Sequence, residues 1–252
     1  MENNYDVINI NVRNDGIFGY LYMPKGNEKY PLVIYSHELA NNYEIAIPYA
    51  EYLASKGIAT YIFDYPGGSN NSKSKGKTTD MTISTEVKDL ECVFNEMKDY
   101  PGIDDKNIFV IGASQGGTVA SMFARKHTKD LKGLILLYPG FNIYDGLHEY
   151  YKSLDNVEDI FSFRGWIDLS KKFVEDVWYQ DYYNEIGDYK GEVLIIHGNA
   201  DVLVPIKYSQ KAQEVYDHAD LIVMDGAKHI FHADNITKAC NYIFDFIKKT
   251  KQ

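Results

Sequence analysis

A serine stands inside a glycine-flanked motif near the middle of the chain. Residues 112–116 read Gly-Ala-Ser-Gln-Gly, a G-x-S-x-G pattern centred on Ser114. An apolar run over 108–111 precedes the motif, and a segment with helical spacing of apolar residues from Val119 to Phe123 follows it. A tight strand-to-helix turn with small neighbours would hold the hydroxyl clear of the sheet, at the positive end of the helix. We therefore predict a catalytic nucleophile; the alternative is a serine that caps the helix.

A serine nucleophile needs a base to take its proton and an acidic residue to orient that base. In the chain order Ser…Asp…His, both partners follow later strands of the sheet. Asp201 comes after the buried run 193–198, and His229 comes after the next run, 221–224. Because the carboxyl ends of parallel strands meet at one edge of a sheet, we expect both side chains beside the serine. The alternative for Asp201 is a turn or capping residue.

Two other histidines compete with His229 for the role of base. His232 lies three residues further along the chain, but His229 directly follows the strand-end loop 225–228 and is favoured for that reason. His197 lies within a strand run and precedes Gly198. We interpret His197 as a packed, hydrogen-bonded histidine rather than a base.

The order of elements around these residues predicts an α/β fold in one domain over residues 1–252, a length that suits a single large core. Buried runs alternate with helical segments, which is typical of a mostly parallel sheet with helices on both faces. The expected strands are 32–36, 58–63, 107–111, 133–138, 192–197 and 221–224. Ahead of them, 5–12 and 17–23 predict an antiparallel hairpin around Asp15-Gly16.

Taken together, these motifs resemble the α/β-hydrolase superfamily, and more closely the bacterial serine esterases of the feruloyl (cinnamoyl) type. The matching stretches are 36–37, 63–69, 112–117, 197–201 and 226–229. The resemblance implies an α/β-hydrolase fold, with Ser114 as nucleophile, His229 as base and Asp201 as its orienter. It also implies two-step acyl transfer on an ester, with no metal and no cofactor. The alternatives are a serine peptidase or acyl hydrolase of this fold and a non-catalytic binding protein.

The loop after the first buried strand departs from the family pattern. Members carry His-Gly and then a bulky residue whose backbone N–H forms half of the oxyanion hole, whereas residues 37–39 read His-Glu-Leu. The resemblance implies the backbone N–H groups of Leu39 and Gln115 as the two donors. A carboxylate pointing inward would oppose a developing oxyanion. We therefore expect Glu38 to point to solvent.

The segment from about 141 to 189 is the part least like a hydrolase core. It holds thirteen of the chain's 36 aromatic residues. Because it leaves the sheet beside the edge that carries Ser114, we interpret it as a small inserted lid with an aromatic acyl pocket. The alternative is a helical excursion that packs its own small core. Asp145, Tyr182 and Tyr183 are the polar groups there that we expect to meet a phenolic hydroxyl of a substrate.

Composition narrows the choice of partners. The net charge of −10 and the lack of a basic stripe disfavour nucleic acid as a partner.

Cys92 and Cys240 fall in helical, apolar settings and are interpreted as buried thiols outside any disulfide or metal site. Residues 1–6 show no leader pattern and no apolar run reaches membrane-spanning length, so a cytoplasmic protein is expected. The expected partner is a small-molecule ester; a homodimer is left open.

Overall fold

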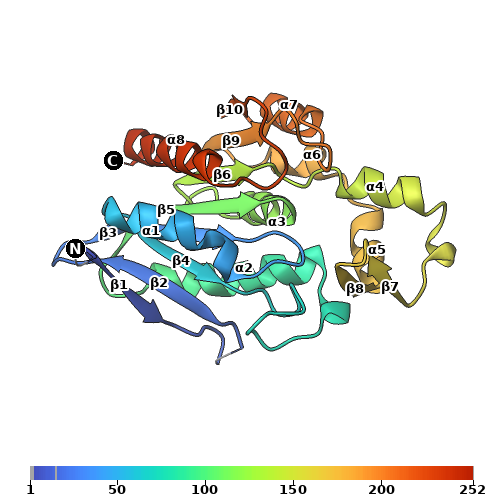
Figure 1. The fold of residues 1–252 in the computed structure, drawn as a ribbon, viewed down its shortest axis with the longest axis horizontal. Coiled ribbons are helices and arrows are strands. Elements are labelled where there is room, and N and C mark those ends of the chain that lie inside the picture. The colour runs from blue at the N-terminus through green and yellow to red at the C-terminus, as the bar shows by residue number, and fades with distance from the viewer. Residues whose placement is uncertain (1–2, 15, 252) are drawn as a thin grey trace.

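A computed structural model describes residues 3–14 and 16–251 of the chain, and an eight-stranded sheet forms its centre (Figure 1). The strands are β1 (Tyr5–Asn9), β2 (Gly19–Pro24), β3 (Tyr30–Ser36), β4 (Ala59–Phe63), β5 (Ile103–Ala113), β6 (Gly133–Leu137), β9 (Glu192–Gly198) and β10 (Ala219–Met224). Their order in the sheet is β1-β2-β4-β3-β5-β6-β9-β10. β1 and β4 run antiparallel to β2, and every other neighbouring pair is parallel. The carboxyl ends of the parallel strands β3, β4, β5, β6, β9 and β10 therefore lie along one edge.

Helices cover both faces of the sheet (Figure 1). α1 (Ile47–Ser55) and α8 (Asp234–Thr250) lie on one face, and α2 (Ile83–Lys98), α3 (Gln115–Ala124), α6 (Tyr182–Ile186) and α7 (Lys207–Val215) lie on the other. Strand β3 shows why two cores form. Its side chains alternate, so that Leu32 and Ile34 join the core under α2 and α3, while Val33 and Tyr35 join the core under α1 and α8.

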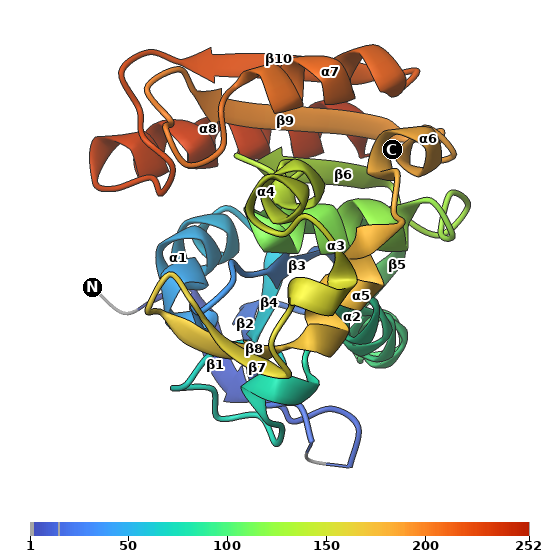
Figure 2. The same ribbon diagram turned by 90° about the vertical axis from the view of Figure 1, so that its right-hand side faces the viewer.

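Between β6 and β9 the chain leaves the carboxyl edge of the sheet and forms a separate layer in front of it (Figure 2). This layer contains α4 (Ile143–Tyr150), β7 (Ile160–Phe163), β8 (Ile167–Ser170) and α5 (Lys171–Trp178). We call residues 141–189 the lid segment. β7 and β8 pair as an antiparallel hairpin, so the segment is not purely helical. Its buried side chains Phe161, Phe173 and Val177 belong to the same apolar cluster as Val110 of the sheet.

The predicted α/β-hydrolase fold is confirmed, and the expected strands lie within a few residues of the observed ones. The N-terminal hairpin pairs β1 with β2 and continues as a bridge between Val12 and Ile17. Asp15 of its predicted turn lies outside the described residues. Cys240 is buried as expected, but Cys92 is only half-buried. Within 3–14 and 16–251, no helix combines the length and apolar character that a bilayer crossing requires.

Candidate active site

Ser114 occupies the sharp turn between β5 and α3. Its backbone has φ 51° and ψ −120°, a conformation that a side-chain-bearing residue adopts only under strain. The turn requires glycine at position 116, because a Cβ there would lie 2.2 Å from the carbonyl oxygen of Ser36. The carbonyl of Ser114 accepts hydrogen bonds from the N–H groups of Gly117 at 2.9 Å and Gly140 at 2.7 Å. These contacts hold the strained turn in place with its hydroxyl at the carboxyl edge.

A continuous chain of hydrogen bonds joins the three residues of the predicted triad. The Ser114 Oγ lies 2.8 Å from Nε2 of His229, and Nδ1 of the same ring lies 2.7 Å from Oδ2 of Asp201. The carboxylate can only accept, so Nδ1 carries the hydrogen and Nε2 is left to accept the serine proton. His232 is exposed. Within the described chain, no hydrogen bond involves the His232 side chain.

Hydrogen bonds to both carboxylate oxygens stabilise the charged form of Asp201. Its Oδ1 accepts from the backbone N–H groups of Leu203 and Val204, each at 2.9 Å. Its Oδ2 accepts from His229 and also lies 3.1 Å from Nε2 of His197. Burial alone would raise the pKa of Asp201, but the hydrogen bonds from His197, His229 and Val204 outweigh burial and hold its pKa well below the usual value. The residue therefore stays charged and can stabilise a protonated histidine.

His197 is packed and hydrogen-bonded as expected, but its contact with Asp201 had no signal in the strand pattern. The ring is fully buried, with Nδ1 2.7 Å from Ser209 Oγ and Nε2 2.9 Å from the carbonyl oxygen of Val204. Because that carbonyl can only accept, Nε2 carries a hydrogen and points it at both oxygens. His197 lies near the end of β9, and Asp201 follows four residues later in the loop after the strand. This short connection brings the two side chains together.

Leu39 and Gln115, the two expected oxyanion donors, lie in the wall of the cavity that also holds Ser114. Both residues line the same cavity as Ser114, and neither N–H has an acceptor among the described residues. The loop that carries Leu39 is fixed by His37, whose Nδ1 donates to the carbonyl of Glu38 at 2.8 Å while its Nε2 accepts from the N–H of Tyr65 at 3.1 Å. Gln115 opens α3, where the first N–H groups have no partner within the helix. The cavity that holds Ser114 is thus lined by two residues whose backbone N–H groups have no acceptor among the described residues.

The Glu38 side chain is buried, so the expectation that it points to solvent is wrong. It is only 3% exposed, and its Oε1 accepts a hydrogen bond from the Tyr138 hydroxyl at 2.8 Å. The Tyr138 ring in turn packs against the ring of His229, with centroids 4.9 Å apart. Burial raises the pKa of Glu38 and so favours its neutral form. The side chain therefore packs inside the protein against Tyr138 and does not reach solvent.

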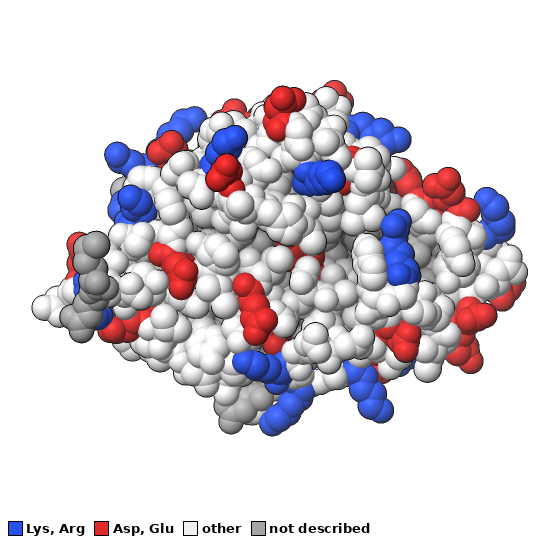
Figure 3. Space-filling view, viewed as in Figure 1, with Lys and Arg blue, Asp and Glu red and all other residues white. Residues whose placement is uncertain are grey.

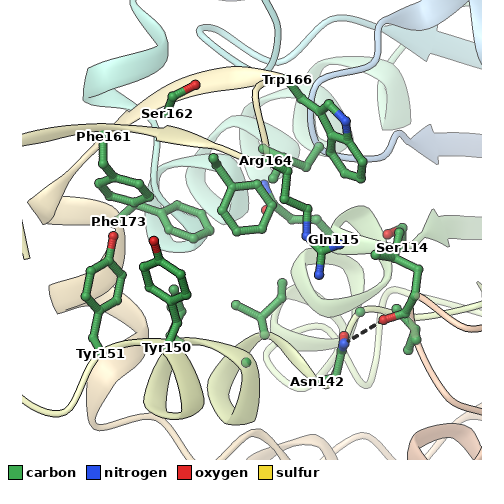
Figure 4. A pocket seen from close by; sticks show the side chains of 18 of the residues that line it. Ser114, Gln115, Asn142, Tyr150, Tyr151, Phe161, Ser162, Arg164, Trp166 and Phe173 are labelled. Atoms are coloured by element: carbon green, nitrogen blue, oxygen red, sulfur yellow. Dashed lines mark hydrogen bonds between the residues drawn. The ribbon is translucent and has the colours of Figure 1, made fainter.

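A cavity of about 830 Å³ opens in front of Ser114, between the sheet edge and the lid segment. Figure 4 shows aromatic side chains of the lid segment turned toward this space, among them Tyr151, Phe161, Phe173 and Trp166. The charged groups of its wall are Lys152, Glu158 and Arg164. On the face drawn in Figure 3, basic side chains are interspersed with acidic ones. The site is therefore an aromatic-walled pocket in a surface of mixed charge.

Three residues expected to contact substrate do not line this cavity. Asp145 accepts a hydrogen bond from the Tyr208 hydroxyl at 2.6 Å on the outer side of α4. Tyr182 is 3% exposed and packs into the core. The Tyr183 hydroxyl donates to the carbonyl of Tyr208 at 3.0 Å. These contacts hold the three side chains away from the cavity, so the expectation that they bind substrate is wrong.

Known proteins are similar to this chain in sequence and in structure. Residues 27–177 match the family model described as "Serine aminopeptidase, S33". The structure of Est1E from Butyrivibrio proteoclasticus with bound ferulic acid is similar over 96% of this chain and 98% of that chain, with a TM-score of 0.85 and 26% identity.

Two curated proteins are similar over shorter stretches. A protein of Escherichia coli named "Uncharacterized 31.7 kDa protein in traX-finO intergenic region" is 29% identical over 105 residues, which are 41% of this chain and 36% of that protein. A proline iminopeptidase of Chitinophaga pinensis is 28% identical over 88 residues, 35% of this chain and 28% of that protein. The matches thus span about a third of the length of these curated relatives.

Proposed function

Because this chain belongs to the serine aminopeptidase S33 family of α/β-hydrolases, we propose that it is a serine hydrolase acting on small or aromatic carboxylic esters. The observation that carries the proposal is the hydrogen-bond chain from Asp201 through His229 to Ser114. Ser114, at the end of this chain, lines an aromatic-walled cavity. Similarity to Est1E, whose structure holds ferulic acid, supports an ester with an aromatic acyl group.

The proposed reaction has two steps. His229 takes the Ser114 proton at Nε2 as the serine oxygen attacks the ester carbonyl, and Asp201 stabilises the imidazolium that forms. The N–H groups of Leu39 and Gln115 bind the oxyanion, a contribution of roughly 2.7–4 kcal/mol per donor in comparable sites. The carbonyl–oxygen bond of the ester breaks, and the alcohol leaves with the proton from His229. Water, activated by the same ring, then releases the acid from the acyl-enzyme.

The shape and lining of the cavity favour flat, compact substrates. Its volume of about 830 Å³ is within the range that binds a small organic molecule. The faces of Phe161, Phe173 and Trp166 suit an aryl group, since aromatic pairs gain energy beyond the area they bury. A long acyl chain would instead need a continuous aliphatic groove.

A serine aminopeptidase is the second candidate, favoured by the family description and by the match to a proline iminopeptidase. Such an enzyme must bind the free ammonium group of its substrate, which calls for a nearby carboxylate. The cavity wall carries two cations, Lys152 and Arg164, against one carboxylate, Glu158. This balance disfavours an ammonium ligand, and we therefore place the ester first.

The test compares kcat/KM across 4-nitrophenyl esters of increasing acyl length, methyl ferulate and prolyl 4-nitroanilide, with Ser114→Ala as the control. We expect turnover of methyl ferulate and of acetyl to butyryl esters, little turnover of esters with ten or more acyl carbons, and none of the anilide. A profile that rises toward long acyl chains with no ferulate hydrolysis would overturn the aromatic-ester proposal. Efficient anilide hydrolysis would favour the aminopeptidase instead.

A further inference from the structure

Arg164 is a cation of the cavity wall that lacks an anionic partner. The chain has three arginines, and the other two pair with carboxylates: Arg13 with Asp89, and Arg125 with Glu185. Within residues 3–14 and 16–251, the Arg164 guanidinium has neither an ion pair nor a hydrogen bond, although the sequence holds 36 acidic residues. An arginine left unpaired in a protein of net charge −10 is available to a ligand.

The fold holds this side chain toward the nucleophile. Residues 164–166 connect β7 and β8, and Arg164 and Gly165 are the central residues of the turn, with φ values of 54° and 71°. The N–H of Trp166 donates to the carbonyl of Phe163 at 2.9 Å and closes the turn. Positive φ at both turn positions matches the twist of a hairpin. The guanidinium carbon lies 5.8 Å from the Phe163 ring centre and 5.6 Å from that of Trp166.

At these distances the guanidinium makes cation–π contacts with two aromatic rings, and such contacts leave its N–H groups free to bind a planar anion. Figure 4 shows the Arg164 side chain extending from the hairpin into the cavity, toward Gln115 and Ser114. The second cation of the wall, Lys152, already donates from Nζ to the carbonyl of Glu149 at 3.2 Å. Lys152 keeps further N–H donors but is a point charge without the planar fork of a guanidinium, so Arg164 is the cation of this wall that can bind a planar anion through two N–H groups at once.

We propose that Arg164 binds an anionic group, a carboxylate or a phosphate, on the part of the ester remote from the reacting carbonyl. The preferred substrates are then aryl esters that carry a negative charge. The inference rests on the proposed function, because it assigns the substrate class of the same site. A carboxylate or phosphate accepts two N–H groups of an arginine at once, which a neutral group of equal size does not.

The test uses substrates that differ only in charge. Methyl 4-carboxycinnamate is paired with methyl 4-carbamoylcinnamate, and 4-carboxyphenyl acetate with 4-carbamoylphenyl acetate, so that the anion sits on the acyl side or the alcohol side. Methyl 4-phosphonocinnamate distinguishes a phosphate-like ligand from a carboxylate. For a charged pair partly open to water, we expect the native protein to prefer the anion in kcat/KM by about fivefold or more in one pair.

Replacement of the arginine should remove that preference. In Arg164→Gln the ratio of anionic to neutral kcat/KM is expected to fall to about one, and Arg164→Lys should keep part of it, because charge remains while the bidentate fork is lost. Lys172→Gln removes one positive charge from the same lid segment at an exposed position outside the cavity and should keep the native ratio. Thermal melting of each variant checks that folding is retained.

Two failures are distinguishable. If no ester is hydrolysed, the proposed function fails. If neutral and anionic esters are hydrolysed alike by the native protein, or if the preference survives in Arg164→Gln, the esterase stands and the role of Arg164 is overturned. Raising the salt concentration should weaken the preference in the native protein and leave the Arg164→Gln ratio unchanged, since screening acts only on a charged pair.

Discussion

Replacing the buried Glu86 by glutamine should make the protein more stable at alkaline pH. Glu86 lies on α2 and is 1% exposed, and its Oε2 accepts a hydrogen bond from the Gln115 side chain at 2.8 Å. Burial, aided by the nearby charge of Asp89, raises the pKa of Glu86 from 4.5 to about 8 despite that hydrogen bond. The group anchors the residue next to Ser114 and is mostly protonated at neutral pH.

The direction of the pH effect follows from proton uptake. Above pH 4.5 the unfolded chain loses the Glu86 proton, while the folded protein keeps it until about pH 8. The folded state thus binds more protons in this window, and the free energy of unfolding falls as the pH rises. For a single group with these two pKa values, the loss between pH 5 and pH 8 is roughly 3–4 kcal/mol. Glu86→Gln keeps an acceptor for Gln115 and has no proton to lose.

Urea denaturation of both proteins at pH 5, 6, 7 and 8 measures this difference. The stability of Glu86→Gln relative to the native protein should increase by roughly 3–4 kcal/mol across the series. Glu214→Gln, at an exposed position on α7, serves as the control and should show no such trend. Curves for the native protein and Glu86→Gln that stay parallel from pH 5 to pH 8 would refute the assignment of a raised pKa to Glu86.

Two further substitutions test the contacts around the nucleophile. His229→Ala should lower kcat at least about a thousandfold in a 4-nitrophenyl acetate assay, because His229 is the base that is hydrogen-bonded to Ser114 within residues 3–14 and 16–251. His232→Ala should stay within about twofold, and a larger loss in His232→Ala than in His229→Ala would reverse the assignment. Glu38→Gln keeps an acceptor for the Tyr138 hydroxyl, whereas Glu38→Ala leaves that hydroxyl buried without one and should cost about 1–3 kcal/mol in urea denaturation. Equal stability of the two Glu38 variants would contradict this account.

The sequence predicts the fold and the triad positions well because both depend on local signals. The strand-turn-helix pattern around Ser114 sets its strained backbone, and the topology of parallel strands brings Asp201 and His229 to the same edge. Each of these residues follows the end of a strand, so a small error in the strand bounds leaves them on the right side of the sheet.

The orientation of single side chains depends on distant residues and was not predictable in the same way. Glu38 turns inward because Tyr138, a hundred residues away, offers it a hydroxyl donor. Asp145 and Tyr183 turn away from the cavity because Tyr208 on α7 offers them partners. The hairpin that carries Arg164 has strands of four residues each, too short for an alternating pattern to identify.

The most direct test of the central claim is the site of covalent labelling by a fluorophosphonate probe, located by peptide mass spectrometry. One adduct is expected, on the Oγ of Ser114, if His229 takes its proton and the N–H groups of Leu39 and Gln115 bind the phosphoryl oxygen, as we propose. Labelling should be absent in Ser114→Ala. An unlabelled Ser114 in a folded protein, or an adduct that persists in Ser114→Ala, would contradict the account.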